Sequence, residues 1–296
     1  MGNKSSILIF GSSGFIGSNA MHLLSPYYSC FGVDIQESEQ TINSDFFYNE
    51  IKKVNPDFIL FAAGSANVLR SKTEPEYDRK KNVTELEELL KAIVQSGQKI
   101  KLIHISSAAV YGNPERLPIE ESSPTHPISN YGKHKLESEE LVRHYHSAFQ
   151  IPSIILRPFS VYGPPQKKLL FYDIYLKSKT QKSITLYGTG HESRDFIFIH
   201  DFITALHLIM QKGDFSSSIY NIASGTETSI REVASHFESL FPSHPVIQFG
   251  GESRGIDPEN WRADISKLRA IGFVPSYNLK DGMQLYYDWL QKTEES

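Results

Sequence analysis

Short apolar runs alternate with amphipathic stretches through the first half of the chain. The apolar runs are rich in β-branched and aromatic residues and lie at 6–10, 31–35, 58–63, 101–107 and 153–159. Strands that are buried on both faces have this composition, as in a parallel sheet covered by helices. Helical patterns lie between the runs, at 15–24, 83–96 and 131–149. The alternation predicts an α/β fold with a Rossmann-type doubly wound parallel sheet.

The regular alternation ends after "RPFSVYGPPQ". Helical patterns then appear at 168–180, 200–212, 229–241 and 279–292, with short extended pieces in "SITLYG" and "PVIQF". We therefore predict a Rossmann domain over 1–163, with segments near 195–225 returning to it, and a smaller lobe over 164–296. The connection from Asp34 to Phe58 is short, so we expect its helix to be abbreviated or irregular.

Composition restricts the class of protein. Hydrophobic residues make up 40% of the 296 residues and charged residues 22%, which is typical of a globular chain. The net charge of -4 gives no support to a nucleic-acid partner. The single cysteine excludes an internal disulfide, and the histidines show no metal-binding spacing. No apolar run approaches the roughly 20 residues of a membrane span, and the N-terminus leaves no room for a signal peptide. We expect a cytoplasmic protein without a metal or a membrane partner.

The stretch "GSSGFIG" (11–17) follows the first predicted strand and opens a helix. Gly11 permits a tight turn, Gly14 lets the backbone approach a pyrophosphate, and Gly17 allows close helix–strand packing. The pyrophosphate would lie at the helix N-terminus. Taken alone, the spacing also fits a purely structural turn.

Asp34 ends the second predicted strand, where an acid accepts hydrogen bonds from the adenosine ribose of a dinucleotide. A carboxylate at this place disfavours a 2′-phosphate, so the sequence favours NAD over NADP. The alternative is a turn aspartate with no ligand.

Tyr131 and Lys135 are one helical turn apart, and Ser107 follows the fourth predicted strand at the edge where ligands bind in open α/β sheets. A neighbouring ammonium and an oxidised nicotinamide would both stabilise a phenolate and lower its pKa. Tyr131 would then take a proton from a substrate hydroxyl that Ser107 also binds. The alternative is a surface helix with a solvated lysine.

These motifs and others in the same order resemble the extended short-chain dehydrogenase/reductases of the NAD-dependent nucleotide-sugar epimerase/dehydratase family, such as UDP-glucose 4-epimerases. The resemblance covers nearly the whole chain: "GSSGFIG", "AAG", "KNVTEL", "SSAAVYG", "YGKHK", "LRPFSVYGP", "RDFIFIHD", "YNIASG", "WRADISKL" and "GFVPSYNLKDG". It implies that the first domain binds NAD and that the C-terminal lobe mainly binds a nucleoside-diphosphate sugar.

The resemblance also implies the residues of the site. The catalytic residues would be Ser107, Tyr131 and Lys135. The cofactor would be bound by Gly11, Gly14, Phe15, Ile16, Gly17, Asp34, Ile35, Ala62, Ala63, Gly64, Asn82, Tyr131, Lys135 and Pro158. The substrate would be bound by Ser107, Ser160, Arg194 and Arg254, and the two arginines suit a diphosphate. In the family, two amphipathic helices pair with their copies in a homodimer as a four-helix bundle; helices that only cover the core are nearly as good an interpretation.

Two departures from the family pattern bear on the reaction. Family dehydratases carry an acidic pair after the active-site Ser/Thr, whereas this chain has Ala108 and Ala109. Alanine cannot transfer protons, so 4,6-dehydration is disfavoured. Ser160 occupies the place where many relatives have an asparagine that contacts the substrate.

The sequence therefore favours an NAD-dependent 4-epimerase of a nucleoside-diphosphate hexose, acting by oxidation at C4 and return of the hydride. The first alternative is a nucleotide-sugar 4-ketoreductase or, less favoured, a dehydratase of a deoxysugar pathway. The second is a non-catalytic dinucleotide-binding regulator. The base and the sugar of the substrate are left open.

Overall fold

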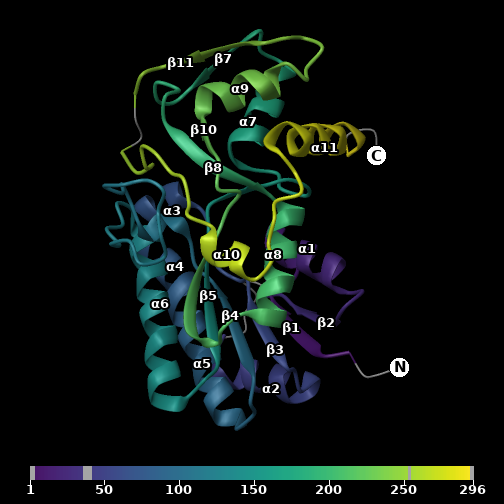
Figure 1. Cartoon of the computed structure of the whole chain (residues 1–296), viewed down its shortest axis with the longest axis vertical. Coiled ribbons are helices and arrows are strands. Elements are labelled where there is room, and N and C mark those ends of the chain that lie inside the picture. The colour runs from purple at the N-terminus through teal and green to yellow at the C-terminus, as the bar shows by residue number, and fades with distance from the viewer. Residues whose placement is uncertain (1–3, 36–41, 253–254, 294–296) are drawn as a thin grey trace.

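A six-stranded parallel sheet forms the larger part of the molecule (Figure 1). The structure is a computed structural model that describes residues 4–35, 42–252 and 255–293. The strands lie in the order β2-β1-β3-β4-β5-β9 and pair in parallel throughout. Their bounds are β1 (Ser6–Phe10), β2 (Ser29–Val33), β3 (Phe58–Phe61), β4 (Lys101–Ile105), β5 (Ser153–Pro158) and β9 (Ser216–Ile222). The predicted doubly wound sheet is confirmed.

Helices cover both faces of this sheet and bury two hydrophobic clusters. The first core lies under α1 (Phe15–Leu24) and α8 (Ile199–Lys212). The second core lies under α2 (Ser44–Val54), α5 (Glu85–Ser96) and α6 (Asn130–Phe149). Successive residues of a strand point to opposite faces, so Ile7 and Ile9 enter the first core while Leu8 and Phe10 enter the second. This two-sided burial explains the nearly continuous apolar runs of the sequence.

Short helical segments join the strands at the edge where their carboxyl ends meet. They are α3 (Val68–Thr73), α4 (Pro75–Arg79), the π-helical turn η1 (Lys80–Thr84) and the 3₁₀ turn η2 (Ala108–Val110). The first three pack against α6, which carries Tyr131 and Lys135. The helix predicted over 83–96 therefore begins as a π-turn, a feature that is often found at functional sites.

A smaller lobe lies above this edge of the sheet (Figure 1). Its sheets have the orders β10-β8-β6 and β11-β7. The remaining elements are β6 (Ser160–Tyr162), α7 (Leu169–Ser178), β7 (Ser183–Leu186), β8 (Ser193–Phe198), β10 (Glu227–Ser229), α9 (Ile230–Glu238), β11 (Val246–Phe249), α10 (Ser266–Ala270) and α11 (Leu279–Lys292). The first core continues from Ile7 of the large sheet to Phe171 and Tyr286 of the lobe, so the two parts share one hydrophobic interior.

The expectation of an abbreviated helix between Asp34 and Phe58 is wrong. α2 is a regular helix, with the Asn43 side chain accepting from the Phe46 N–H at its start and Asn55 in a left-handed conformation at its end. Phe47 and Ile51, one turn apart, are fully buried in the second core. The capping asparagines and this apolar pair stabilise the helix despite the short connection.

Candidate active site

The glycine turn between β1 and α1 is shaped by close backbone contacts. Gly11 has a φ of +84°, and its N–H donates to the Val33 carbonyl at 2.8 Å. A Cβ on Gly11 would lie 2.7 Å from the Ala63 nitrogen, and a Cβ on Gly17 would lie 2.0 Å from the Gly11 carbonyl oxygen. Side chains are therefore excluded at both positions by the protein's own backbone, so the two glycines let the turn pack tightly against the end of β3 and the start of α1.

The N-terminus of α1 is free of side-chain caps. Gly14 occupies the N-cap position, no side chain accepts from the first turn, and that turn holds no acidic residue. The unpaired N–H groups and the helix dipole favour an anion there, so the turn fits the pyrophosphate of a dinucleotide. Phe15 and Ile16 begin the helix and pack against the first core.

Asp34 lies beside this glycine turn. Its carboxylate accepts from the Ser13 N–H at 2.8 Å and from the Ser12 hydroxyl at 3.2 Å. These bonds hold an acidic group at the end of β2, and its role toward a ribose stays a prediction. Ile35 follows and packs against the second core.

Gly64 lies against two other predicted cofactor residues, Asn82 and Lys135. Ala62, Ala63 and Gly64 follow β3, and a Cβ on Gly64 would lie 2.7 Å from Asn82 Oδ1 and 3.7 Å from Lys135 Nζ. Asn82 donates from Nδ2 to the Ser65 carbonyl at 3.1 Å, while its Oδ1 is buried without a hydrogen-bond partner in the part of the chain that the structure describes. A buried acceptor of this kind needs an explanation, and a bound ligand provides one. The residues present fit a dinucleotide.

Ser107, Tyr131 and Lys135 come together at the ends of β4 and α6. Ser107 caps η2 by accepting from the Ala109 N–H at 3.1 Å. Tyr131 lies in the first turn of α6 and is buried, and the Ser107 side chain is close enough to lower the pKa of its hydroxyl. Lys135 Nζ donates to the Ile105 carbonyl at 2.9 Å and lies 6.0 Å from the centre of the Tyr131 ring.

Burial dominates the electrostatics of this group. Burial raises the pKa of Tyr131 to about 12. The Ser107 side chain lowers that pKa, whereas the negative charge of Asp78 raises it. Burial also lowers the pKa of Lys135 to about 8, against the charges of Asp78 and Glu139, which raise it. The predicted lowering of the phenol pKa is therefore not a property of the polypeptide alone, because removal from water outweighs the neighbouring groups.

Comparison with known proteins decides the family. The profile described as "NAD dependent epimerase/dehydratase family" matches residues 7–223. The chain belongs to this family. It is accordingly an NAD-dependent enzyme of the epimerase/dehydratase type, as the motifs predict.

Individual relatives agree with this assignment. The chain is 28% identical to a putative UDP-glucose 4-epimerase of Methanocaldococcus jannaschii, over 98% of this chain and 100% of the relative. It is 31% identical to an uncharacterized UDP-glucose epimerase of Bacillus subtilis, over 68% of this chain and 64% of the relative. A solved UDP-glucuronic acid 4-epimerase of Bacillus cereus, in complex with UDP-glucuronic acid and NAD, superposes with a TM-score of 0.88 at 27% identity, covering 97% of this chain and 99% of that one.

The remaining predicted site residues of this epimerase/dehydratase family member lie on several elements. The predicted substrate residue Ser160 begins β6 and is half-buried, and the predicted cofactor residue Pro158 ends β5. Arg194 of β8 donates from Nη1 to the carbonyls of Ser193 at 2.7 Å and Glu259 at 3.3 Å. Arg254 lies outside the described residues. The roles of these four residues stay predictions.

A buried ion pair beneath the site was not predicted from the sequence. Arg157 of β5 donates to both carboxylate oxygens of Glu139 in α6, at 2.9 and 2.7 Å. Glu139 also accepts from the Ser106 hydroxyl at 2.6 Å. The pair therefore fixes α6 and the start of the Ser107 turn relative to each other. The sequence signal is slight: Glu139 is one helical turn after Lys135, on the same face.

Two further buried groups escaped the sequence analysis. Asp78 of α4 is fully buried and lies 2.7 Å from Nδ1 of His134 in α6, measured from its Oδ2. The two residues are far apart in the sequence, so no local pattern joins them.

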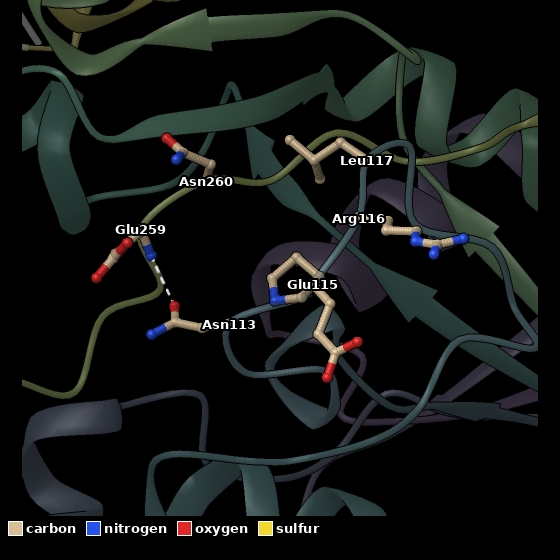
Figure 2. A pocket seen from close by; sticks show the side chains of 7 residues that line it. Asn113, Glu115, Arg116, Leu117, Glu259 and Asn260 are labelled. Carbon is tan, nitrogen blue, oxygen red and sulfur yellow. Dashed lines mark hydrogen bonds between the residues drawn. The ribbon is translucent and has the colours of Figure 1, made fainter.

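A surface hollow lies beyond the active-site turn (Figure 2). It is lined by Asn113, Pro114, Glu115, Arg116, Leu117, Glu259 and Asn260. The Glu259 N–H donates to Asn113 Oδ1 at 2.8 Å, and the neighbouring Trp261 indole donates to the Gly112 carbonyl at 2.9 Å. These bonds tie the segment after η2 to the chain before α10. Among the residues that the structure describes, no predicted site residue lines the hollow.

Proposed function

We propose that this enzyme is an NAD-dependent 4-epimerase of a nucleoside-diphosphate hexose. The observation that carries the proposal is the buried phenol of Tyr131, with the side chains of Ser107 and Lys135 beside it. The similarity to the putative 4-epimerase of M. jannaschii and to the 4-epimerase of B. cereus supports it.

The residues perform the reaction as follows. When bound at the glycine turn, NAD would supply the group that accepts the hydride from C4 and returns it. Tyr131 takes the proton of the C4 hydroxyl, while Ser107 donates to or accepts from the same oxygen and holds it in place. The 4-keto sugar then turns its other face, and Tyr131 gives the proton back. Because the resting phenol has a raised pKa, the positive charges of Lys135 and of the nicotinamide are needed to make it a base.

The residues next to Ser107 restrict the chemistry. Ala108 is buried and Ala109 is half-buried in η2, and neither side chain can donate or accept a proton. Elimination of water from the hexose needs an acid and a base close to C4 to C6. We therefore place this chain with the epimerases of its family rather than with the dehydratases.

We propose that the two ligands are bound by the residues that the family resemblance implies. The dinucleotide would be held by the glycine turn, Asp34, the segment 62–64, Asn82 and Lys135, with Phe15, Ile16, Ile35 and Pro158 lining its pocket. The substrate diphosphate would be held by Arg194 and Arg254, and the sugar would contact Ser107 and Ser160. Asp34 favours NAD, which suits a cycle with no net reduction.

The test is incubation of the purified protein with UDP-glucose, UDP-GlcNAc, and GDP- and dTDP-hexoses, without added reductant. We expect one of these sugars to be interconverted with its C4 epimer. If no sugar is interconverted, and 4-keto sugars are instead consumed with stoichiometric loss of NAD(P)H, the protein is a ketoreductase.

Replacing Tyr131 by Phe separates catalysis from binding. We expect turnover to fall by about 10²–10⁴-fold, the range for loss of a general acid–base group, with NAD affinity changed little because the ring remains. Turnover and NAD affinity measured on the same preparation check this. A variant with unchanged output would identify a dinucleotide-binding regulator instead.

We also propose a cytoplasmic homodimer in which α5 and α6 pair with their copies. The two helices lie side by side (Figure 1), and their outer face carries the exposed apolar residues Val94 and Phe149. Light scattering coupled to size exclusion should give twice the mass of the chain. A monomer would refute the four-helix bundle.

A further inference from the structure

Asp78 is a buried carboxylate that the reaction described above does not use. Its side chain is fully buried at the end of α4, and Oδ2 accepts from His134 Nδ1 at 2.7 Å. Oδ1 is buried and has no hydrogen-bond partner among the residues that the structure describes. A buried carboxylate with one oxygen unpaired is unfavourable unless its charge serves another group.

The groups that face Asp78 are those of the active site. On α6, Tyr131, His134 and Lys135 have spacings of three and four residues, so they share the helix face. The segment α3–α4–η1 packs against this helix, and Ser71 of α3 accepts the Tyr131 N–H at 3.1 Å. Asp78 therefore lies opposite the phenol and the ammonium, in a region closed to water, where charges act strongly on each other.

The other charges close to this region are already paired. Glu139 is bound by Arg157, and Lys81 of η1 lies 2.8 Å from Glu85. His104 of β4 is fully buried, and burial holds its pKa well below the ordinary value, which keeps it neutral. Asp78 is hydrogen-bonded to the imidazole of His134, whereas Glu139 and Glu85 are paired with an arginine and a lysine.

We propose that Asp78 is a positioning residue that supplies the counter-charge for the Tyr131–Lys135 pair, and that His134 holds its carboxylate in place. This inference rests on the proposed function for its kinetic test. A negative charge favours the ammonium of Lys135 and disfavours the phenolate of Tyr131, so it raises the pKa of both groups. Asp78 thus sets the pH range in which the pair holds one proton between its two members, the form that can accept a proton from substrate.

The sign of the effect gives a sharp kinetic test. The two groups titrate as a pair, and the rate should depend on pH as a bell whose limbs belong to that pair. Asp78→Asn keeps the shape and removes the charge. Both limbs should then move to lower pH by about 1 unit, the lower end of the range for a neighbouring charge. A residue that only stabilises the fold would lower the bell without moving it.

Two matched variants define the cause. Glu137→Gln removes another carboxylate between α4 and α6. Glu137 pairs with Arg79 of α4, but both side chains are exposed, so solvent screens their charges. His134→Gln removes the imidazole and keeps both a donor and the charge of Asp78. Both variants should leave the bell in place. Should E137Q move it as far as D78N does, or H134Q move it while D78N does not, the inference is overturned.

A second readout needs neither substrate nor turnover. The ¹³C chemical shift of the Lys135 ε-carbon, followed against pH in protein with ¹³C-labelled lysine, gives the titration midpoint of Lys135 without chemical access to the side chain, and the spectrum of Lys135→Met assigns the signal. The midpoint should fall in D78N and stay in E137Q, and Asp78→Ser serves if the asparagine variant does not fold. A shifted midpoint in a protein that converts no sugar would sink the proposed function and keep this inference. An unshifted midpoint in an active epimerase would overturn this inference and keep the proposed function.

Discussion

Lys135 shows at the scale of one residue how function opposes stability. The side chain is 5% exposed, and burial lowers its pKa from 10.5 to about 8. Because the folded-state value is the lower one, the ammonium destabilises the fold fully below pH 8, by an amount that shrinks between pH 8 and 10.5 and then vanishes. Lys135→Met should therefore raise the free energy of unfolding at pH 7 by roughly 1–3 kcal/mol, allowing for the lost bond to the Ile105 carbonyl. Turnover should be lost.

Denaturant unfolding at pH 7 and pH 10.5 measures this difference. Lys133→Met is the matched control, because Lys133 lies on the exposed side of the same helix and its removal should change stability equally at both pH values. Equal destabilisation of K135M at both values would show that the hydrogen bond, rather than the buried charge, decides the energy.

The same residues show what the sequence could and could not predict. The spacing of Tyr131 and Lys135, and the place of Ser107 after a strand, were sufficient to bring the three groups together. The direction of the Tyr131 pKa shift was not predictable, because it depends on burial by segments such as α3 and α4 that the Y-x-x-x-K spacing does not contain. Asp78 and His134 were missed for the same reason: their contact joins two helices, and no periodicity encodes it.

At the scale of elements, Asp195 of β8 joins three parts of the chain. Its Oδ1 accepts from the Ser224 N–H and hydroxyl, and its Oδ2 accepts from the N–H groups of Gly225 and Ala263 at 3.0 and 3.1 Å. Asp195→Asn would place an amide donor against these two N–H groups. We expect a loss of about 2–4 kcal/mol in the free energy of unfolding, measured by denaturant titration.

Ser224→Ala is the control for this prediction. It removes the hydroxyl donor and leaves the backbone N–H groups, so it should lower stability by about 1 kcal/mol or less. A loss in D195N no larger than that in S224A would mean that the local chain relaxes and that Asp195 does not hold the elements together.

Elements were predicted well where periodicity was strong and poorly where capping decides. α1, α6 and α11 lie within one residue of the predicted limits, because each shows a clear apolar stripe or a sharp start. α2 was underestimated because the short connection from Asp34 to Phe58 was given more weight than the two asparagines that cap the helix. The predicted helix over 83–96 includes only the last two residues of the π-turn at 80–84, because the composition of the turn does not distinguish it from its surroundings.

The first core is continuous from β1 to the C-terminal lobe, so we expect the whole molecule to fold as one unit. A fragment of residues 1–163, the predicted first domain, lacks β9, which pairs with β5 along its length. It also lacks α8, whose Phe202, Leu206 and Ile209 are fully buried or nearly so. β5 would become an unprotected edge and one face of the sheet would lose its cover.

We therefore expect the fragment 1–163 to show no cooperative thermal transition and to aggregate, whereas the full chain should unfold in a single transition that NAD moves to higher temperature. At a ligand concentration of about 100 times the dissociation constant, the stabilisation should be about 2.7 kcal/mol. Circular dichroism and scanning calorimetry on both proteins measure this. A sharp, reversible transition in the fragment would show that the sheet is stable without its last strand, and the boundary near Gly163 would then separate two independent domains.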